Sequence, residues 1–195
     1  MSSKIRKKAT TKDMLKYISP DKRMLNLGSG RDYRKGWVNL ENNMMHKADS
    51  RHDLDKFPYP FKNEEFDFIY CSHILEHVRD FRKTFLELLR ITKRKGIIYI
   101  RVPHFSNGSG YSNLDHKRFF GWNTFDMLIK GDVWEDNYDF KIINKRYNYH
   151  SFQKFYLRGL INFILNKIVP PRYYERHLYG IFPMAGELIF ILQKT

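Results

Sequence analysis

The chain has 195 residues, 42% of them hydrophobic, and a formal net charge of +14. This length is typical of one domain with a single core, and the single cysteine, Cys71, excludes an internal disulfide. The longest apolar region, residues 155–169, is interrupted by charged and amide side chains and is shorter than the roughly 20 residues of a membrane span. Because no apolar stretch follows the basic N-terminus, we expect no secretory signal and a cytoplasmic protein.

The charge pattern divides the chain into two parts. Residues 1–20 are expected to form a basic arm and a short amphipathic helix around residues 14–18. Residues 21–195 are expected to form a single domain with a helical insertion near 152–171. A strong positive charge attracts nucleic acid, anionic lipid, nucleotide sugars or acidic polysaccharide, so charge alone selects no partner.

Strand and helix patterns alternate along the predicted domain. An amphipathic helix is predicted over residues 80–93, because Phe81, Phe85 and Leu88 recur at helical spacing, and Gly96 is expected to cap it. Strands are predicted at residues 24–27, 37–40, 66–71, 96–102, 141–147 and 187–192. This alternation predicts an α/β fold with a parallel sheet.

A glycine turn follows the first predicted strand. Gly28 and Gly30 allow the backbone to turn sharply and to approach a ligand closely. Glu41 ends the second predicted strand, where a carboxylate can accept hydrogen bonds from ribose hydroxyls. A nicotinamide dinucleotide fits poorly, because position 33 is Tyr rather than a third glycine and Glu41 follows Gly30 by only eleven residues. The turn therefore predicts a site for another nucleoside-containing cofactor.

The carboxyl ends of parallel strands are the edge at which such folds bind their ligands. At this edge we expect the glycine turn, Glu41, residues 71–73 and residues 103–105 to surround one crevice. The predicted cofactor site and the predicted acceptor site would then share one side of the sheet.

A family resemblance rests on three segments: Leu25-Asn-Leu-Gly-Ser-Gly30; Asp53-Leu-Asp-Lys-Phe-Pro-Tyr-Pro-Phe61 running into Glu65-Phe-Asp-Phe-Ile-Tyr70; and Ser72-His-Ile-Leu-Glu-His-Val78. In order and spacing they resemble class I S-adenosylmethionine-dependent methyltransferases of the small Methyltransferase-11-like type. The resemblance implies a Rossmann-like, doubly wound, mostly parallel sheet with an antiparallel C-terminal strand, and S-adenosylmethionine as the cofactor. Because the loop from Gly30 to Trp37 is short, we expect the usual first helix to be reduced or absent.

The resemblance also implies roles for individual residues. The glycine turn would pass beneath the methionine part of the cofactor. Glu41 would bind the ribose, Asp53 the adenine amino group, and Leu54 would pack on the adenine ring. The expected cofactor contacts are Gly28, Ser29, Gly30, Glu41, Asp53, Leu54, Cys71, Ser72 and His73.

Two histidines are candidates for catalysis. Methyl transfer from a sulfonium is an in-line displacement, so holding the acceptor in place supplies most of the catalysis. A hydroxyl acceptor also needs a base, for which His104 and His116 are the candidates, because histidine titrates near neutrality. The alternative for both is a structural role, in which the ring of His104 would satisfy a loop carbonyl. The expected substrate contacts are Tyr111, Asp115 and Arg118.

A histidine pair raises the question of a metal. His73 and His77 are four residues apart and would share one face of a helix. No carboxylate-rich ligand set accompanies them, so we expect no metal. We expect His77 to hydrogen-bond within its own loop.

The acceptor is inferred from motifs that are absent and present. The chain lacks the Asp/Asn-Pro-Pro-Tyr loop of nucleic-acid amino-methyltransferases. Its Val-Pro-His-Phe-Ser segment at 102–106 and Asp-His-Lys-Arg-Phe-Phe segment at 115–120 resemble methyltransferases of surface polysaccharide assembly. We therefore expect a sugar hydroxyl of a glycan or glycan precursor, with Arg101 and Arg118 available to an anionic acceptor. The alternatives are an RNA methyltransferase that uses the basic arm and a non-catalytic domain that binds S-adenosylmethionine.

The insertion near 152–171 carries a helix that is apolar almost all round, and such a helix needs cover. A homodimer interface or packing over the acceptor cleft would provide it. The alternative is shallow docking on an anionic membrane.

Overall fold

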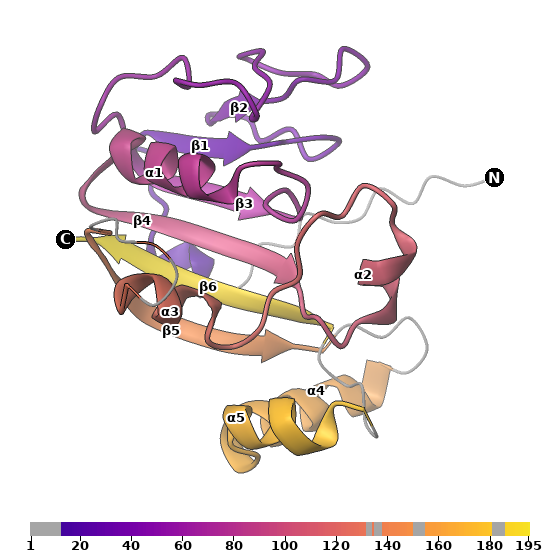
Figure 1. Cartoon of the computed structure of the whole chain (residues 1–195). Helices are drawn as coiled ribbons and strands as arrows, with labels where there is room; N and C mark the ends of the chain where they lie inside the picture. The colour runs from indigo at the N-terminus through magenta and orange to yellow at the C-terminus, as the bar shows by residue number, and fades with distance from the viewer. Residues whose placement is uncertain (1–12, 132–133, 135–137, 150–154, 181–185) are drawn as a thin grey trace.

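The structure, a computed structural model, describes residues 13–131, 134, 138–149, 155–180 and 186–195. The basic residues 1–12 and the first part of the expected insertion therefore lie outside the described residues. Six strands form one sheet in the order β2-β1-β3-β4-β6-β5 (Figure 1). The strands are β1 (Met24–Leu27), β2 (Val38–Leu40), β3 (Phe66–Ser72), β4 (Thr92–Pro103), β5 (Phe140–Asn148) and β6 (Glu187–Lys194). All six predicted strands are confirmed.

The helices connect these strands and extend past one edge of the sheet. They are η1 (Met14–Lys16), α1 (Phe81–Ile91), α2 (Gly108–Ser112), α3 (Thr124–Ile129), α4 (Phe155–Phe163), η2 (Ile164–Ile168), α5 (Pro171–Tyr173) and η3 (Tyr174–Leu178). The short helix expected near residue 14 is thus a single 3₁₀ turn. Helices α1 and α3 lie on one face of the sheet, whereas α4 and α5 lie beyond its β5 edge (Figure 1).

The strand directions confirm the predicted fold class. Strands β2, β1, β3 and β4 are parallel neighbours. The C-terminal strand β6 is antiparallel to both β4 and β5, so β5 runs in the direction of the first four. The carboxyl ends of five strands therefore lie at one edge, and α2 lies beyond it (Figure 1).

Residues 28–37, all of them described, connect β1 to β2 without a helix, as expected from their number. Buried amides hold this connection in place. Asn26 Nδ2 donates to the Asp32 carbonyl oxygen at 2.7 Å and to Asn39 Oδ1 at 3.1 Å. Asn39 Oδ1 also accepts from the Arg34 N–H, and the Arg34 guanidinium lies 4.3 Å from the centre of the Tyr70 ring. Because these buried polar groups are paired, they fix the path by which the glycine turn leaves β1.

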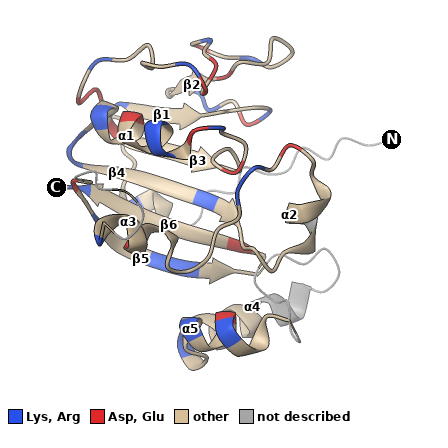
Figure 2. Cartoon of the chain, in the orientation of Figure 1, with Lys and Arg blue, Asp and Glu red and all other residues tan. Residues whose placement is uncertain are grey.

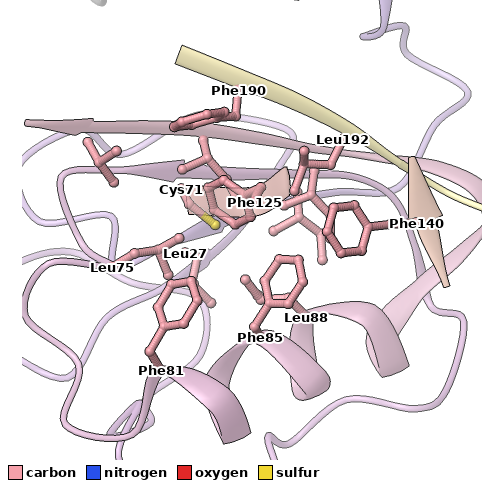
Figure 3. Close-up of a cluster of buried hydrophobic side chains, with 14 of the residues drawn as sticks. Leu27, Cys71, Leu75, Phe81, Phe85, Leu88, Phe125, Phe140, Phe190 and Leu192 are labelled. Carbon is pink, nitrogen blue, oxygen red and sulfur yellow. The ribbon is translucent and has the colours of Figure 1, made fainter. Parts of the chain in front are cut away.

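Helix α1 supplies much of the hydrophobic core. Its first turn is capped by Asp80, whose carboxylate accepts the backbone N–H three residues later at 3.0 Å. Phe81 and Phe85 project from α1 toward the sheet and pack on Phe125 of α3, whose ring in turn packs on Phe190 of β6 (Figure 3). The aromatic spacing in the sequence therefore correctly predicted the buried face of this helix.

The prediction that Gly96 caps α1 is wrong. The helix ends at Ile91, and β4 begins at the next residue, Thr92. Gly96 lies inside β4, where an added Cβ would come within 2.7 Å of the Lys93 carbonyl oxygen. Glycine is needed there for close approach of the backbone rather than to end a helix.

The opposite face of the sheet is covered by a second, smaller cluster. Met14 of η1 is fully buried and packs in this cluster with Phe68, Tyr70, Tyr99 and Ile189. Met14, which lies in the predicted N-terminal segment 1–20, therefore packs on the sheet of the predicted domain.

Charge and exposed apolar surface are distributed over several elements. Lys and Arg residues occur on α1, β5 and α5 (Figure 2). Leu160, Phe163 and Ile168, at the β5 edge, are each more than half exposed. Within the described ranges, every helix is too short or too polar to cross a lipid bilayer. Cover of the α4 helix by a homodimer partner, by the acceptor cleft or by a membrane stays a prediction.

Candidate active site

The glycine turn brings β1 against the turn that follows β3. Gly28 has a φ of +60°, in the left-handed region, and an added Cβ would lie 2.4 Å from Ile74 Cγ1. Gly30 has a φ of +49°. The turn therefore requires glycine at position 28 for two reasons, its backbone conformation and the lack of space for a side chain.

Glu41 closes the glycine turn from the end of β2. Its Oε2 accepts the Gly30 N–H at 2.7 Å, and its Oε1 accepts the Asn43 N–H at 2.8 Å. Each carboxylate oxygen has a further lone pair. Glu41 can therefore hold the turn in shape and still accept hydrogen bonds from the hydroxyls of a ligand.

A cavity of about 160 Å³ opens beside this turn. Its apolar lining is Leu40, Leu54, Ile74 and Val78, and its polar lining includes Glu41, Asp53 and His77. An apolar slot with a few polar groups at its rim suits a flat aromatic ring with polar edges. The structure therefore gathers Gly28, Glu41, Asp53 and Leu54 of the predicted cofactor contacts around one cavity.

Three further predicted cofactor contacts do not line this cavity: Ser29, Cys71 and Ser72. Ser29 is 5% exposed, and its hydroxyl makes no hydrogen bond with any described residue. Ser72 is half-buried at the carboxyl end of β3. Cys71 is fully buried in the core cluster, so its side chain lies outside the cavity lining. The prediction of a cofactor contact by Cys71 therefore does not fit its side chain.

We expect Cys71 to resist thiol reagents while the protein is folded. Burial raises the pKa of its thiol well above the usual range, and the nearby Glu76 carboxylate raises this pKa further. The reactive thiolate is therefore scarce and shielded from solvent. Reaction with a chromogenic disulfide should be slow for the folded protein and fast in urea. Rapid reaction of the folded protein would contradict the core position.

An ion-pair network that was not predicted from the sequence lies at the carboxyl ends of β3 and β4. Arg101 Nη2 donates to both Glu187 oxygens, at 3.0 and 2.8 Å. His73 Nε2 lies 2.8 Å from Glu187 Oε1, and Asn148 Nδ2 donates to Oε2 at 2.7 Å. The sequence contains one indication of this network, since a charge inside an apolar strand requires a buried partner.

The network fixes the charges of its members. Burial alone would lower the pKa of His73, but its close contacts with Glu187 and Glu76 and the negative charges of both carboxylates outweigh this effect and raise the pKa to about 9. Burial would raise the pKa of Glu187, but His73 and Arg101 hold it well below its usual range. His73 is therefore a cation near neutral pH, unsuited to act as a base.

His104 is enclosed by protein instead of facing the cavity. Its side chain has no exposed surface, and its Nε2 lies 3.0 Å from Glu175 Oε1. Its Nδ1 lies 2.7 Å from Ser106 Oγ, and the ring packs against Tyr147 and Tyr174. Because both ring nitrogens are occupied, a structural role replaces the role of base that the sequence suggested.

His116 lies at the rim of the cavity. Its ring centre is 4.7 Å from that of His77, which lines the cavity. His116 Nδ1 lies 2.8 Å from the Gly110 carbonyl oxygen. A carbonyl only accepts hydrogen bonds, so Nδ1 carries a proton, and in the neutral ring the lone pair is on Nε2. One of the two candidate bases therefore lies beside the predicted cofactor position with a lone pair available.

The predicted substrate residues do not converge in one pocket: Tyr111 belongs to α2, whereas Asp115 and Arg118 lie in the segment that follows it. Tyr111 is 58% exposed, and its ring stacks on Phe119 with centres 4.3 Å apart. Asp115 is exposed. Arg118 donates to the Arg79 carbonyl oxygen and lines a different cavity, of about 440 Å³. Contact of these residues with an acceptor stays a prediction.

Comparisons with known proteins agree with this geometry. The methyltransferase-domain family model matches residues 15–100, which include the glycine turn, Glu41, Asp53 and the turn after β3. No curated protein sequence matches the chain.

Solved structures share the fold over most of the chain. A SAM-dependent methyltransferase from Archaeoglobus fulgidus is 15% identical with a TM-score of 0.59, covering 93% of this chain and 90% of that one. A putative methyltransferase from Bacillus halodurans is 13% identical with a TM-score of 0.61, covering 93% and 96%. A putative sarcosine dimethylglycine methyltransferase from Galdieria sulphuraria is 15% identical with a TM-score of 0.60, covering 94% and 82%. At these identities the likeness shows the fold alone.

The residues of the cavity fit S-adenosylmethionine. Gly28 leaves backbone space that a Cβ would fill, Glu41 offers carboxylate oxygens to the ribose, and Leu54 offers an apolar face to the adenine. The methyltransferase-domain match contains these residues, and the shared fold extends beyond it. Residues 15–100 therefore match a methyltransferase domain, the chain has the Rossmann-like fold of SAM-dependent methyltransferases, and together these findings support a SAM-dependent methyltransferase with S-adenosylmethionine as its cofactor.

Proposed function

We propose that the chain methylates a sugar hydroxyl of a glycan or glycan precursor. S-adenosylmethionine, when bound, supplies an electrophilic methyl group. The observation that carries the proposal is the position of His116, whose Nε2 lone pair is left free by the Gly110 contact beside His77 at the cavity rim. A hydroxyl is the kind of acceptor that needs help to lose its proton, whereas more acidic or more nucleophilic groups do not.

The choice of a sugar rests on the loop that holds His116. Residues 102–106 and 115–120 resemble methyltransferases of polysaccharide assembly, and the net charge of +14 favours an anionic acceptor. The exposed ring of Tyr111 and the stacked Phe119 offer the flat apolar surface on which a sugar face can pack. Positioning by this loop would supply most of the rate acceleration.

Transfer of labelled methyl from S-adenosylmethionine into fractionated glycans, RNA, lipids and small molecules tests the proposal. We expect label in the glycan fraction. Label in RNA would support the nucleic-acid alternative instead. Binding of S-adenosylmethionine without label in any fraction would support a non-catalytic domain. If calorimetry detects no binding of the cofactor or of S-adenosylhomocysteine, the proposed function fails.

Replacing each candidate histidine should separate their roles. We expect His116→Gln to lower turnover by roughly 10²- to 10⁴-fold, the usual contribution of acid–base assistance, with an unchanged melting temperature. His104→Ala should lower the melting temperature, because Glu175 and Ser106 lose their buried partner. Labelled-methyl kinetics and thermal unfolding measure the two effects. Equal turnover of His116→Gln and the unmodified protein would remove His116 from the mechanism.

A further inference from the structure

Three side chains converge next to the cofactor cavity. Glu76, His77 and His116 each present one potential ligand atom, and these atoms all lie within 4.8 Å of one another. His77 also lines the cavity, so the cluster borders the predicted methyl donor. The backbone N–H of Lys117 donates to the Glu76 carbonyl oxygen at 2.8 Å, which holds the His116 loop against the turn after β3.

Glu76 is the member whose pairing within the protein is incomplete. It is 1% exposed, and neither carboxylate oxygen accepts a hydrogen bond from any residue that the structure describes. His73 Nδ1 lies 3.3 Å from Oε1 and is one ionic partner of this carboxylate, but the same imidazolium is shared with Glu187, which lies 2.8 Å from Nε2. One shared imidazolium offsets only part of the desolvation cost of a buried carboxylate that accepts no hydrogen bond, so a further cation would stabilise Glu76.

His116 already has the arrangement of a metal-binding histidine. Its Nδ1–H donates to the Gly110 carbonyl oxygen, which fixes the ring and leaves the Nε2 lone pair free. Histidine ligands usually make such a hydrogen bond with their second nitrogen. The half-buried rings of His77 and His116 leave room for the small shift that brings ligand atoms to roughly 2.0–2.2 Å from an ion.

We propose that Glu76, His77 and His116 bind one divalent transition-metal ion at the rim of the cofactor cavity. Two imidazoles and one carboxylate suit ions such as Co²⁺, Mn²⁺ or Zn²⁺, whereas Ca²⁺ prefers a shell of six or more oxygens. Three protein ligands leave open positions for water or a ligand oxygen. The sequence suggested His73 and His77 as a possible metal pair, without accompanying carboxylates. In the structure the partners of His77 are instead Glu76 and His116, whereas His73 binds Glu187.

The role of this ion rests on the proposed function, although its binding does not. A hydroxyl oxygen of the acceptor would occupy an open position on the ion. Coordination lowers the pKa of a bound hydroxyl, so its proton would pass to solvent water near neutral pH. With the ion bound, the Nε2 lone pair of His116 would assist loss of the proton through the ion; without the ion, it would act on the hydroxyl directly, as in the proposed function.

The site is tested by titrating the tag-free, metal-free full chain with Co²⁺. Visible d–d absorption and calorimetry measure the binding. We expect one bound Co²⁺ and weaker or no binding of Ca²⁺. Glu76→Gln and His116→Gln should each weaken Co²⁺ binding by about tenfold or more. The matched control is His46→Gln, a half-buried loop histidine outside the cluster, which should bind Co²⁺ as the unmodified chain does. Unchanged Co²⁺ affinity in both cluster variants, or no binding to the unmodified chain, would overturn the site.

Two further measurements keep the conclusions separate. S-adenosylhomocysteine binding and circular dichroism should be retained in His116→Gln, because this residue lies on a loop outside the core. If the unmodified chain binds Co²⁺ but not S-adenosylhomocysteine, the metal site stands and the proposed function fails. If a chelator removes the ion and methyl transfer continues at the same rate, the catalytic role of the ion is wrong.

Discussion

Gly28→Ala is expected to weaken S-adenosylmethionine binding by about 10- to 100-fold while the chain still folds. A left-handed conformation costs an L-residue roughly 1–2 kcal/mol, and Gly28 has a φ of +60°. The added Cβ would also lie 2.4 Å from Ile74 Cγ1, so the glycine turn or the turn after β3 must move. Either movement changes the cavity that both turns line. Calorimetric titration with the cofactor measures the affinity, and circular dichroism checks the fold.

Gly36→Ala is the matched control for this change. Gly36 also has a left-handed backbone, with a φ of +82°, but an added Cβ there would meet no atom within 4 Å. Gly36→Ala should therefore lower the free energy of unfolding without changing cofactor affinity. Combining Gly28→Ala with Ile74→Ala should restore part of the affinity, because the second change removes the atoms in contact. Cofactor affinity unchanged by Gly28→Ala alone would show that the ligand lies elsewhere.

The fold was predictable where local pattern and tertiary environment agree. β3 is an apolar run bounded by polar residues, and α1 combines a capping Asp80 with aromatic residues at helical spacing. At Gly96 the two disagree. A local capping rule placed the end of a helix there, but Thr92 already pairs with Phe66 of β3, so the sheet begins earlier.

The cofactor half of the site was predictable for the same reason. Gly28 and Glu41 directly follow strand ends that the sequence marks, so the topology alone brings them to one edge, whereas Asp53 lies in the connection from β2 to β3 and was assigned by the family resemblance. The sequence could not show which of His104 and His116 is buried in a structural role and which lies near the cavity. His104 is buried because Tyr147 and Tyr174, from β5 and η3, enclose its ring. His116 lies near Glu76 because the neighbouring Lys117 N–H donates to the Glu76 carbonyl oxygen, a contact between segments distant in sequence.

The buried ion pair could not be predicted either, because its two members are far apart in the sequence. Arg101 and Glu187 are 86 positions apart in the chain and meet only because β6 inserts beside β4. Each looks like an isolated charge at the end of an apolar strand. Their register, with Pro103 opposite Glu187 and Arg101 opposite Ile189, places both at the same end of the sheet.

Glu187→Ala is expected to destabilise the fold by about 3–5 kcal/mol, the usual result of removing one partner of a buried ion pair. The Arg101 side chain is 7% exposed and would keep its charge without the carboxylate. His73 Nε2 and Asn148 Nδ2 would lose a buried acceptor as well. Urea unfolding near neutral pH measures the change in the free energy of unfolding.

Arg79→Ala is the matched control, because the Arg79–Asp55 pair is 3.5 Å apart and Arg79 is 81% exposed. Its loss should cost less than about 1 kcal/mol. The pH dependence gives a second test with Glu187→Gln. The folded-state pKa of Glu187 lies below its ordinary value of 4.5, so its charge stabilises the fold above that pH and this contribution is lost as pH falls through the folded-state pKa. The stability gap between Glu187→Gln and the unmodified chain should therefore be constant near neutrality and narrow in acid. A gap that stays constant into acid would show that Glu187 does not ionise in the folded chain.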